Sequence, residues 1–259
     1  KFPFIQKSCS ISIFEKSSYL KKIQKKKLKK YKIRWLNHLT DLPNFPTIFI
    51  ANEFFDALPI KQFIKKKNKW YERNIKYSKS SKAKILDLLT TVKKLETKVG
   101  FKISSGQKFI EFSPLSLKYL KYISKSIKLN NGGLLIIDYG YLDKKMKNTL
   151  KSISKHKFND VLENFGKSDI SHDLNFKLIE KIVNMLGLKV NGITSQKYFL
   201  EKLGILERAE LISKDVPFSE KANIYFRLKK LIDINEMGHL FKVMFVTKKN
   251  MNFKTGFQN

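Results

Sequence analysis

Apolar runs of strand length alternate with amphipathic stretches along the first third of the chain. Residues 10–14 (SISIF), 31–35 and 48–51 have the length and composition of β-strands. After Ser17 and Ser18, which suit a helix cap, a lysine-rich stretch carries apolar side chains at helical spacing. Strands that alternate with helices in this way are typical of α/β proteins. The pattern therefore predicts an α/β fold with a doubly wound, parallel sheet.

A hairpin and several amphipathic helices follow. Extended runs at residues 60–65 and 70–77 flank a turn and predict a β-hairpin. Ser113 and Pro114 suit the start of a helix, which Asn131 and the two following glycines end. Further helices are predicted for residues 85–99, 144–150, 176–186, 196–203, 205–212 and 222–231, and further strands for residues 134–137, 188–193 and 239–247. Residues 109–114 are predicted to be a short strand or a turn that enters a helix.

The stretch IFIANEFFDALPIKQF, residues 48–63, is the centre of the predicted sheet. Its first four residues are apolar and predict a strand buried on both faces, which ends at Asn52, Glu53 and Asp56. Polar groups just past the carboxyl end of a buried strand lie where open α/β sheets bind ligands. The alternative is a helix cap, with Asn52 as the cap and the two carboxylates favoured by the helix dipole. The spacing alone allows both interpretations.

Acidic residues follow two further predicted strands. Glu15 ends the first strand, and Asp138 and Tyr139 end the strand at residues 134–137. Acids are scarce in this chain, with 22 Asp and Glu against 53 Lys and Arg, so helix capping explains their coincidence at strand ends poorly. A cluster of carboxylates suits a ligand with hydroxyls and positive charge, such as a sulfonium cofactor, a guanidinium or an ammonium.

Glu15 occupies the place of the acid that binds ribose hydroxyls in dinucleotide-type folds. The strand and glycine-rich turn that precede such an acid do not occur before it in this sequence. We therefore expect the chain to lack the amino-terminal part of the fold, including the first strand of the sheet.

The formal net charge of +31 suggests nucleic acid or an anionic membrane surface as a partner. However, only four of the basic residues are arginine, the residue on which nucleic-acid readers rely most. Lysine enriched together with Ile, Asn and Phe is also the product of codon bias in an AT-rich genome. We favour that bias over a nucleic-acid surface because the charge is spread along the whole chain.

Several chemistries are disfavoured by what the sequence does not contain. Cys9 is the only cysteine, which excludes an internal disulfide and indicates a reducing compartment. The four histidines, among them His156, lack metal-ligand spacing, so we expect no metal site. Neither a G-x-S-x-G string nor a P-loop occurs, and no apolar run reaches the length of about 18 residues that a membrane span needs.

Several motifs together resemble the MidA family of S-adenosylmethionine-dependent methyltransferases. That family includes the mitochondrial complex I assembly factor that methylates an arginine of a complex I subunit. The motifs are the stretch at residues 48–63, WYER at 70–73, EFSP at 111–114, GGLLIIDYG at 132–140 and MGHLFKV at 237–243. The family's E-x-G-x-G cofactor loop is missing, and residues 165–176 match the family's corresponding loop only loosely.

The resemblance implies a seven-stranded, Rossmann-like (class I) methyltransferase sheet with an inserted hairpin and extra helices. It implies a single domain over residues 1–259, with insertions at about 60–110 and 141–235, and S-adenosyl-L-methionine as cofactor. The substrate it implies is an arginine of a protein, either a complex I subunit or its bacterial counterpart. The compartment would be the bacterial cytoplasm, or the mitochondrial matrix in a eukaryote.

The resemblance also assigns roles to the residues at the strand ends. Glu15 would bind the cofactor ribose, while Asn52 and Glu53 would face the methionine end of the cofactor and the incoming nucleophile. Because an arginine nucleophile is protonated, a carboxylate that accepts its N–H bonds can localise the charge and expose a lone pair. We expect Glu53 to be that catalytic carboxylate, with Asp56 or Asp138 in support and Tyr139 in the substrate site.

Two alternatives remain. A nucleic-acid amino-methyltransferase places Asn or Asp, two prolines and an aromatic residue after this strand, and residues 52–55 partly follow that order. The missing prolines and the adjacent acid count against it. The other alternative is a non-catalytic assembly or interaction factor built on a methyltransferase scaffold.

Overall fold

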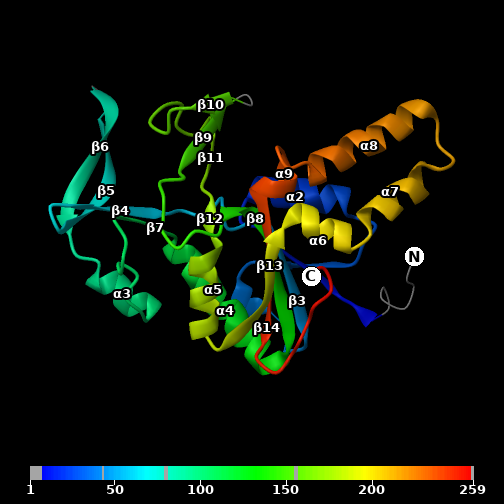
Figure 1. The fold of residues 1–259 in the computed structure, drawn as a ribbon, viewed down its shortest axis with the longest axis horizontal. Coiled ribbons are helices and arrows are strands. Elements are labelled where there is room, and N and C mark those ends of the chain that lie inside the picture. Colours follow the sequence, from blue (N-terminus) through cyan, green and yellow to red (C-terminus); the bar gives the residue numbers. More distant parts are fainter. Residues whose placement is uncertain (1–7, 43, 79–80, 155–156, 258–259) are drawn as a thin grey trace. The chain divides into compact units, whose positions relative to one another are not determined.

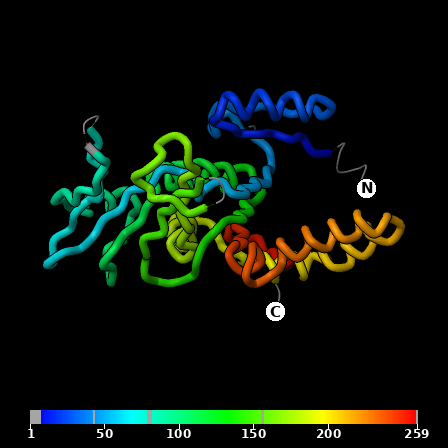
Figure 2. The backbone as a smooth tube through the Cα atoms, turned by 90° about the horizontal axis from the view of Figure 1, so that it is seen from above, coloured from blue at the N-terminus to red at the C-terminus, as the bar shows by residue number. Residues whose placement is uncertain are grey.

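The computed structural model describes residues 8–42, 44–78, 81–154 and 157–257. The chain divides into two compact units, Lys1–Phe45 and Pro46–Asn259. The first unit is the dark blue part of Figures 1 and 2, and the second unit carries the other colours. That the chain forms a single domain stays a prediction.

The first unit is a strand–helix–strand motif. Its elements are β1 (Ile11–Phe14), α2 (Ser18–Lys27), β2 (Ile33–Leu36) and a short 3₁₀ helix (Leu39–Asp41). β1 and β2 pair in parallel, with Ile11 opposite Ile33. The hydroxyl of Ser17 accepts a hydrogen bond from the amide of Leu20 (3.2 Å) and so caps α2. The strand–helix–strand order predicted for this region is confirmed.

The second unit is built on a mixed, five-stranded sheet with β8 at its centre (Figure 1). β8 pairs in parallel with β3 and with the short β12, and antiparallel with β14, which in turn pairs antiparallel with β13. Helices α4 and α5 pack against this sheet. The bounds are β3 (Thr47–Asn52), α4 (Pro114–Asn130), β8 (Gly132–Tyr141), β12 (Leu174–Asn175), α5 (Phe176–Met185), β13 (Leu188–Ser195) and β14 (Phe241–Lys248). The predicted α/β class is confirmed, but the prediction of a parallel sheet is wrong, because β14 runs antiparallel to both of its neighbours.

The start and end of α4 follow from the sequence. Ser113 accepts a hydrogen bond from the amide of Ser116 (3.1 Å), and Pro114 occupies the first helical position. The helix ends at Asn131, and Gly132 then enters β8 with φ +107°. A Cβ at Gly132 would lie 2.0 Å from the carbonyl oxygen of Thr47, so only glycine allows β3 to approach this closely.

The prediction that residues 48–51 are buried on both faces is wrong. Ile48 and Ile50 are 60% and 70% exposed, whereas Ala51 on the opposite face is buried. The reason is that alternate side chains of a strand point to opposite faces, and only the face of β3 that carries Ala51 is covered. β3 is also an edge strand of its unit among the described residues, since it pairs with β8 on one side only.

A second, antiparallel sheet of four strands has the order β6-β5-β4-β7. The predicted hairpin is confirmed as β4 and β5, and its turn places Lys67 and Asn68 in the left-handed region. The predicted helix at 85–99 is wrong for its first half, since residues up to Thr90 pair with β5 and helix begins only at Lys93. Pairing with a neighbouring strand outweighs the local helical spacing. The bounds are β4 (Lys61–Lys66), β5 (Lys69–Ser78), β6 (Ser81–Thr90), α3 (Lys93–Val99) and β7 (Phe109–Phe112).

A small antiparallel sheet of three strands follows β8. It consists of β9 (Lys151–Ser154), β10 (Lys157–Asn159) and β11 (Asp169–Ser171), in the order β10-β9-β11. The helix predicted at 144–150 is wrong. Asn148 and Thr149 instead bond the side chains of Gln62 and Glu111, and these tertiary bonds compete with helix formation.

Four helices lie between β13 and β14 in the sequence. They are α6 (Gln196–Lys202), α7 (Ile205–Ser213), α8 (Phe218–Ile232) and the short α9 (Met237–Leu240). The three longer ones confirm the predicted helices of this region. Over the part of the chain that the structure describes, no helix has both the length and the apolar character that crossing a membrane requires.

Candidate active site

The chain makes a tight turn directly after β3, at the edge of the sheet. The amide of Glu53 donates to the carbonyl of Ile137 on β8 (3.0 Å), and the residues that follow form a turn rather than a helix. The helix-cap interpretation of this stretch is therefore wrong. Glu53 itself has φ +46°, a conformation that costs a residue with a side chain about 1 kcal/mol or more. Its carboxylate is exposed and accepts a hydrogen bond from the side-chain amide of Asn52 (3.3 Å).

Asp138 holds this turn in place from the end of β8. Its Oδ2 atom accepts the amide protons of Phe54 (3.3 Å), Phe55 (3.0 Å) and Asp56 (3.3 Å), and Oδ1 accepts that of Tyr139 (3.0 Å). The side chain is fully buried. Burial, with the charge of Asp56 in addition, raises the pKa of Asp138 to about 8, while the backbone amides act in the opposite direction. This geometry favours positioning of the turn over direct contact with a substrate.

Asp56 closes the turn and has an unusual environment. It is 8% exposed, and its backbone carbonyl accepts the amide proton of His172 (3.1 Å). The carboxylate atom Oδ1 is buried and lacks a hydrogen-bond partner among the described residues. Burial first, and the charge of Glu53 second, raise the pKa of Asp56. A buried carboxylate oxygen without a partner is costly, which makes Asp56 a candidate to meet a ligand.

Tyr139 presents its ring beside these carboxylates. One side of the ring packs against Phe241, with centroids 4.0 Å apart, and the ammonium of Lys151 lies 4.6 Å from the ring centroid. Lys151 also pairs with Asp173 at 2.5 Å. Burial raises the pKa of Tyr139, and four carboxylates raise it further, those of Glu53, Asp56, Asp138 and Asp173.

A buried polar network around Glu111 connects to Asp173 of the site. Glu111 accepts hydrogen bonds from Gln62 (2.6 Å) and from the hydroxyl of Thr149, which in turn accepts the amide proton of Asp173 (2.9 Å). A small cavity of about 50 Å³ lies next to this network, and its lining includes Phe55, Tyr141 and His172. A space of this size suits one or two water molecules.

His172 is part of that cavity wall and is 6% exposed. Burial lowers its pKa to about 4, and its Nδ1 atom has no hydrogen-bond partner among the described residues. The imidazole is therefore neutral in the folded protein at physiological pH.

The structure brings together five of the six site residues predicted from the sequence. These five are Asn52, Glu53, Asp56, Asp138 and Tyr139, all in the second unit. Glu15 belongs to the first unit, where its carboxylate accepts the amide proton of Ser17 (2.8 Å) and a side-chain proton of Gln24 (3.1 Å). These bonds stabilise the start of α2, and the predicted ribose contact stays a prediction.

No site role was predicted for three residues that the structure places here, which are Thr149, Lys151 and His172. Thr149 lies in the stretch predicted as a helix, and the pairing of β9 with β11 brings the segments of these residues together. His156 lies outside the described residues. Among those that are described, no group of three or more His, Cys, Asp or Glu side chains could hold a metal ion.

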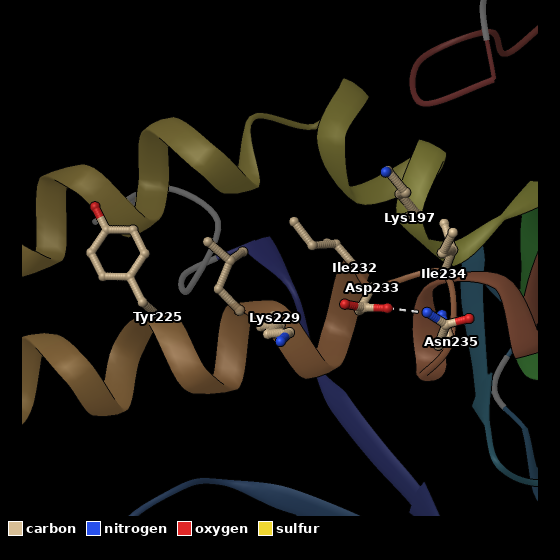
Figure 3. A pocket seen from close by; sticks show the side chains of 8 residues that line it. Lys197, Tyr225, Lys229, Ile232, Asp233, Ile234 and Asn235 are labelled. Atoms are coloured by element: carbon tan, nitrogen blue, oxygen red, sulfur yellow. Dashed lines mark hydrogen bonds between the residues drawn. The ribbon is translucent and has the colours of Figure 1, made fainter.

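A larger hollow of about 550 Å³ lies elsewhere in the second unit (Figure 3). Its lining comes from α6, from α8 and from the connection to α9, and includes Lys197, Tyr225 and Asp233. The side chains that line it are distinct from those of the turn after β3.

A family model described as "Putative S-adenosyl-L-methionine-dependent methyltransferase" matches residues 1–194. The chain is 27% identical over 210 residues to "Protein arginine methyltransferase NDUFAF7, mitochondrial" of Danio rerio, which covers 81% of this chain and 49% of that protein. It is 28% identical over 228 residues to the Caenorhabditis elegans homologue, covering 85% of this chain and 52% of that protein. The chain thus spans about half the length of these relatives.

Two solved structures from Burkholderia thailandensis share the fold. One is an uncharacterised protein with a TM-score of 0.78 and 22% identity, matched over 96% of this chain and 69% of that one. The other was crystallised with S-adenosyl-homocysteine and has a TM-score of 0.74 and 21% identity, over 96% of this chain and 65% of that one. The class I methyltransferase-like fold and the resemblance to the MidA-type methyltransferases are confirmed, and the chain belongs to the family of S-adenosyl-L-methionine-dependent methyltransferases that the matching model describes.

Proposed function

We propose that this chain is part of an enzyme that transfers a methyl group from S-adenosyl-L-methionine to an arginine side chain of a protein. The observation that carries the proposal is the strained turn after β3. It exposes the carboxylate of Glu53 at φ +46° while the buried Asp138 holds the turn through three backbone amides. Strain of this kind persists only where the surroundings enforce it, and it concentrates at functional sites.

The residues at the end of β3 fit one end of the cofactor. Asn52 is exposed and offers a side-chain amide, which suits the amino-acid end of S-adenosyl-L-methionine. Glu15, in the first unit, has the chemistry to bind ribose hydroxyls. When bound, the cofactor supplies a methyl group on a positively charged sulfur.

The chain's own contribution to the reaction is to orient the nucleophile. The carboxylate of Glu53 accepts N–H bonds from the guanidinium, which localises the positive charge on one side and exposes a lone pair on the remaining nitrogen. Asp56 supports this from the same turn, and Tyr139 offers a ring face to the cation. Holding the reacting groups in line accounts for most of the rate gain in a displacement of this type.

The substrate is proposed to be a protein, since the curated relatives at 25–28% identity are named protein arginine methyltransferases. A complex I subunit, or its bacterial counterpart, is the candidate that the family resemblance suggests. The same relatives are named as mitochondrial, so a mitochondrial matrix or bacterial location stays a prediction.

The test is Glu53→Gln, which keeps the size of the side chain and removes its charge. We expect methyl transfer by the whole gene product to fall by roughly a hundredfold or more, because one charge-assisted acceptor is lost from the site. Cofactor affinity should stay within about tenfold, as measured by calorimetry with S-adenosyl-L-methionine. Loss of cofactor binding would instead assign Glu53 to the cofactor site. Absence of binding in the unaltered protein would favour a non-catalytic scaffold.

A further inference from the structure

A cation of the chain itself lies against the ring of Tyr139. The ammonium of Lys151 lies 4.6 Å from the ring centroid, a distance at which a cation is attracted by an aromatic face. The same ammonium pairs with the carboxylate of Asp173 at 2.5 Å. The ring is held in position by Phe241, whose centroid is 4.0 Å away. The end of β8 is therefore built to hold a positive charge.

The surroundings of this cation are far more acidic than the chain as a whole. The chain has 22 acidic residues and a formal net charge of +31, yet four carboxylates act together on Tyr139. One of them, Asp56, is 8% exposed, and its Oδ1 atom has no hydrogen-bond partner among the described residues. The charge of Lys151 acts on the carboxylate of Asp56 as well. One ammonium leaves this unpartnered oxygen unsatisfied.

Lys151 and Asp173 differ in how firmly they are held. The backbone amide of Asp173 donates to Thr149 (2.9 Å), which is bonded to the buried Glu111, so the acid is anchored in the polar network. Lys151 reaches the ring by a flexible side chain from the first residue of β9, and the side chains of Lys151 and Asp173 are 23% and 36% exposed, so water reaches both ends of this pair. An ion pair that water reaches contributes little, so the flexible ammonium can leave the ring at low cost.

We propose that the ring face of Tyr139 and the carboxylates of Asp56 and Asp173 form the binding site for the substrate's cationic side chain. Lys151 occupies this site until the substrate displaces it. This deepens the proposed function and rests on it for the identity of the substrate as an arginine. A planar guanidinium stacks on an aromatic ring and offers five donors in a fork, so it can bond two carboxylates while its plane lies against the ring. Lys151 is then a specificity-determining residue, which sets how strongly a cation must bind in order to enter.

The test is a titration of N-acetyl-L-arginine amide, followed by NMR, into the unaltered protein and into Lys151→Met. The methionine keeps the apolar stem and removes the competing charge. We expect the probe to bind about tenfold more tightly to this variant, which corresponds to about 1.4 kcal/mol. N-acetyl-L-lysine amide should bind more weakly than the arginine probe to both proteins.

Lys147 offers a matched control. Its ammonium lies 4.7 Å from the ring centroid of Tyr141 and pairs with Asp143 at 2.6 Å, so it makes the same two kinds of contact. Both members of that pair are more than half exposed. Lys147→Met should leave the affinity for the arginine probe unchanged.

The ring is tested by two further variants. Tyr139→Phe keeps the aromatic face and should keep binding, whereas Tyr139→Leu should weaken it about tenfold or more. Weaker or equal binding to Lys151→Met, compared with the unaltered protein, would overturn the proposal, and so would probe binding that is insensitive to Tyr139→Leu. Titration of S-adenosyl-L-methionine into the same proteins shows whether a variant has lost binding of the cofactor or only binding of the arginine probe.

Discussion

Two turns of this chain begin alike, each with an acidic residue directly after a β-strand, and they differ in what holds them. After β1, Glu15 bonds Ser17 and Gln24, which are 2 and 9 residues away in the sequence. After β3, the turn of Glu53 is held by Asp138, whose partners are 82 to 84 residues distant. The first arrangement stabilises a helix start. The second forces an exposed carboxylate into a strained conformation, which is a property of sites rather than of caps.

The contrast teaches that an acid at a strand end is an ambiguous signal until its partners are known. Local hydrogen bonds satisfy the carboxylate of Glu15. The backbone of Glu15 lies outside the left-handed region. Glu53 has one weak side-chain bond, to the neighbouring Asn52, and its strain is stabilised from another strand. Variants at the two turns should therefore behave differently.

The largest difference is expected for the residue that holds the second turn. Asp138→Asn replaces one of two accepting oxygens by a donor, so the three amides of the turn and the amide of Tyr139 cannot all keep an acceptor. We expect a loss of about 2–3 kcal/mol in the free energy of unfolding, measured with urea. Glu15→Gln keeps an accepting oxygen at an incompletely buried site and should cost less than about 0.5 kcal/mol. Equal losses of unfolding free energy in the two variants would contradict the view that distant bonds hold the turn after β3 and local bonds the turn after β1.

An effect of comparable size on the free energy of unfolding is expected when the pH is lowered. The pKa of His172 is lowered by burial from 6.5 to about 4, so the unfolded chain takes up a proton as the pH falls below 6.5 while the folded chain does not. The stability that neutral His172 confers is present above pH 6.5 and is lost progressively towards pH 4. The unaltered protein should thus lose up to about 3 kcal/mol relative to His172→Gln over this range, in urea unfolding at several pH values.

His38, which is exposed and belongs to the first unit, provides the control for this experiment. His38→Gln should follow the pH profile of the unaltered protein. A parallel profile for His172→Gln and the unaltered protein would show that the histidine behind the second turn is not held neutral by the fold.

The smallest effect is expected when the acidic residue of each turn is replaced by glycine. The change in the free energy of unfolding should have opposite signs at the two turns. Glu53→Gly relieves a conformation that glycine adopts freely at φ +46°, and should raise the free energy of unfolding by about 0.5–1 kcal/mol. Glu15→Gly removes a side chain that bonds Ser17 and Gln24, and should lower it by about 1 kcal/mol. Thermal unfolding of the two variants measures both changes. A loss of stability in Glu53→Gly would contradict the assignment of strain.

Much of the fold was predictable because its signals are local. Ser17 and Ser113 cap the helices that follow them, and the hairpin of β4 and β5 is confirmed. The predictions that are wrong concern residues whose conformation depends on a partner distant in the sequence. Residues 85–90 have helical spacing but pair with β5, and residues 144–150 are held by bonds to Gln62 and Glu111. The apolar residues Ile48 and Ile50 predict burial, yet an edge strand leaves them exposed.

The residues that follow the strands can be read from the sequence alone, which locates Asn52, Glu53, Asp56 and Asp138 as candidates. The motifs of the family to which the chain belongs are also visible there. The folded chain was needed to show that Asp138 is a buried anchor, that Glu53 is strained and that Lys151 lies on the Tyr139 ring. Caps and turns depend on neighbours a few residues away, whereas burial, strain and the pairing of charges depend on groups that only the folded chain brings together.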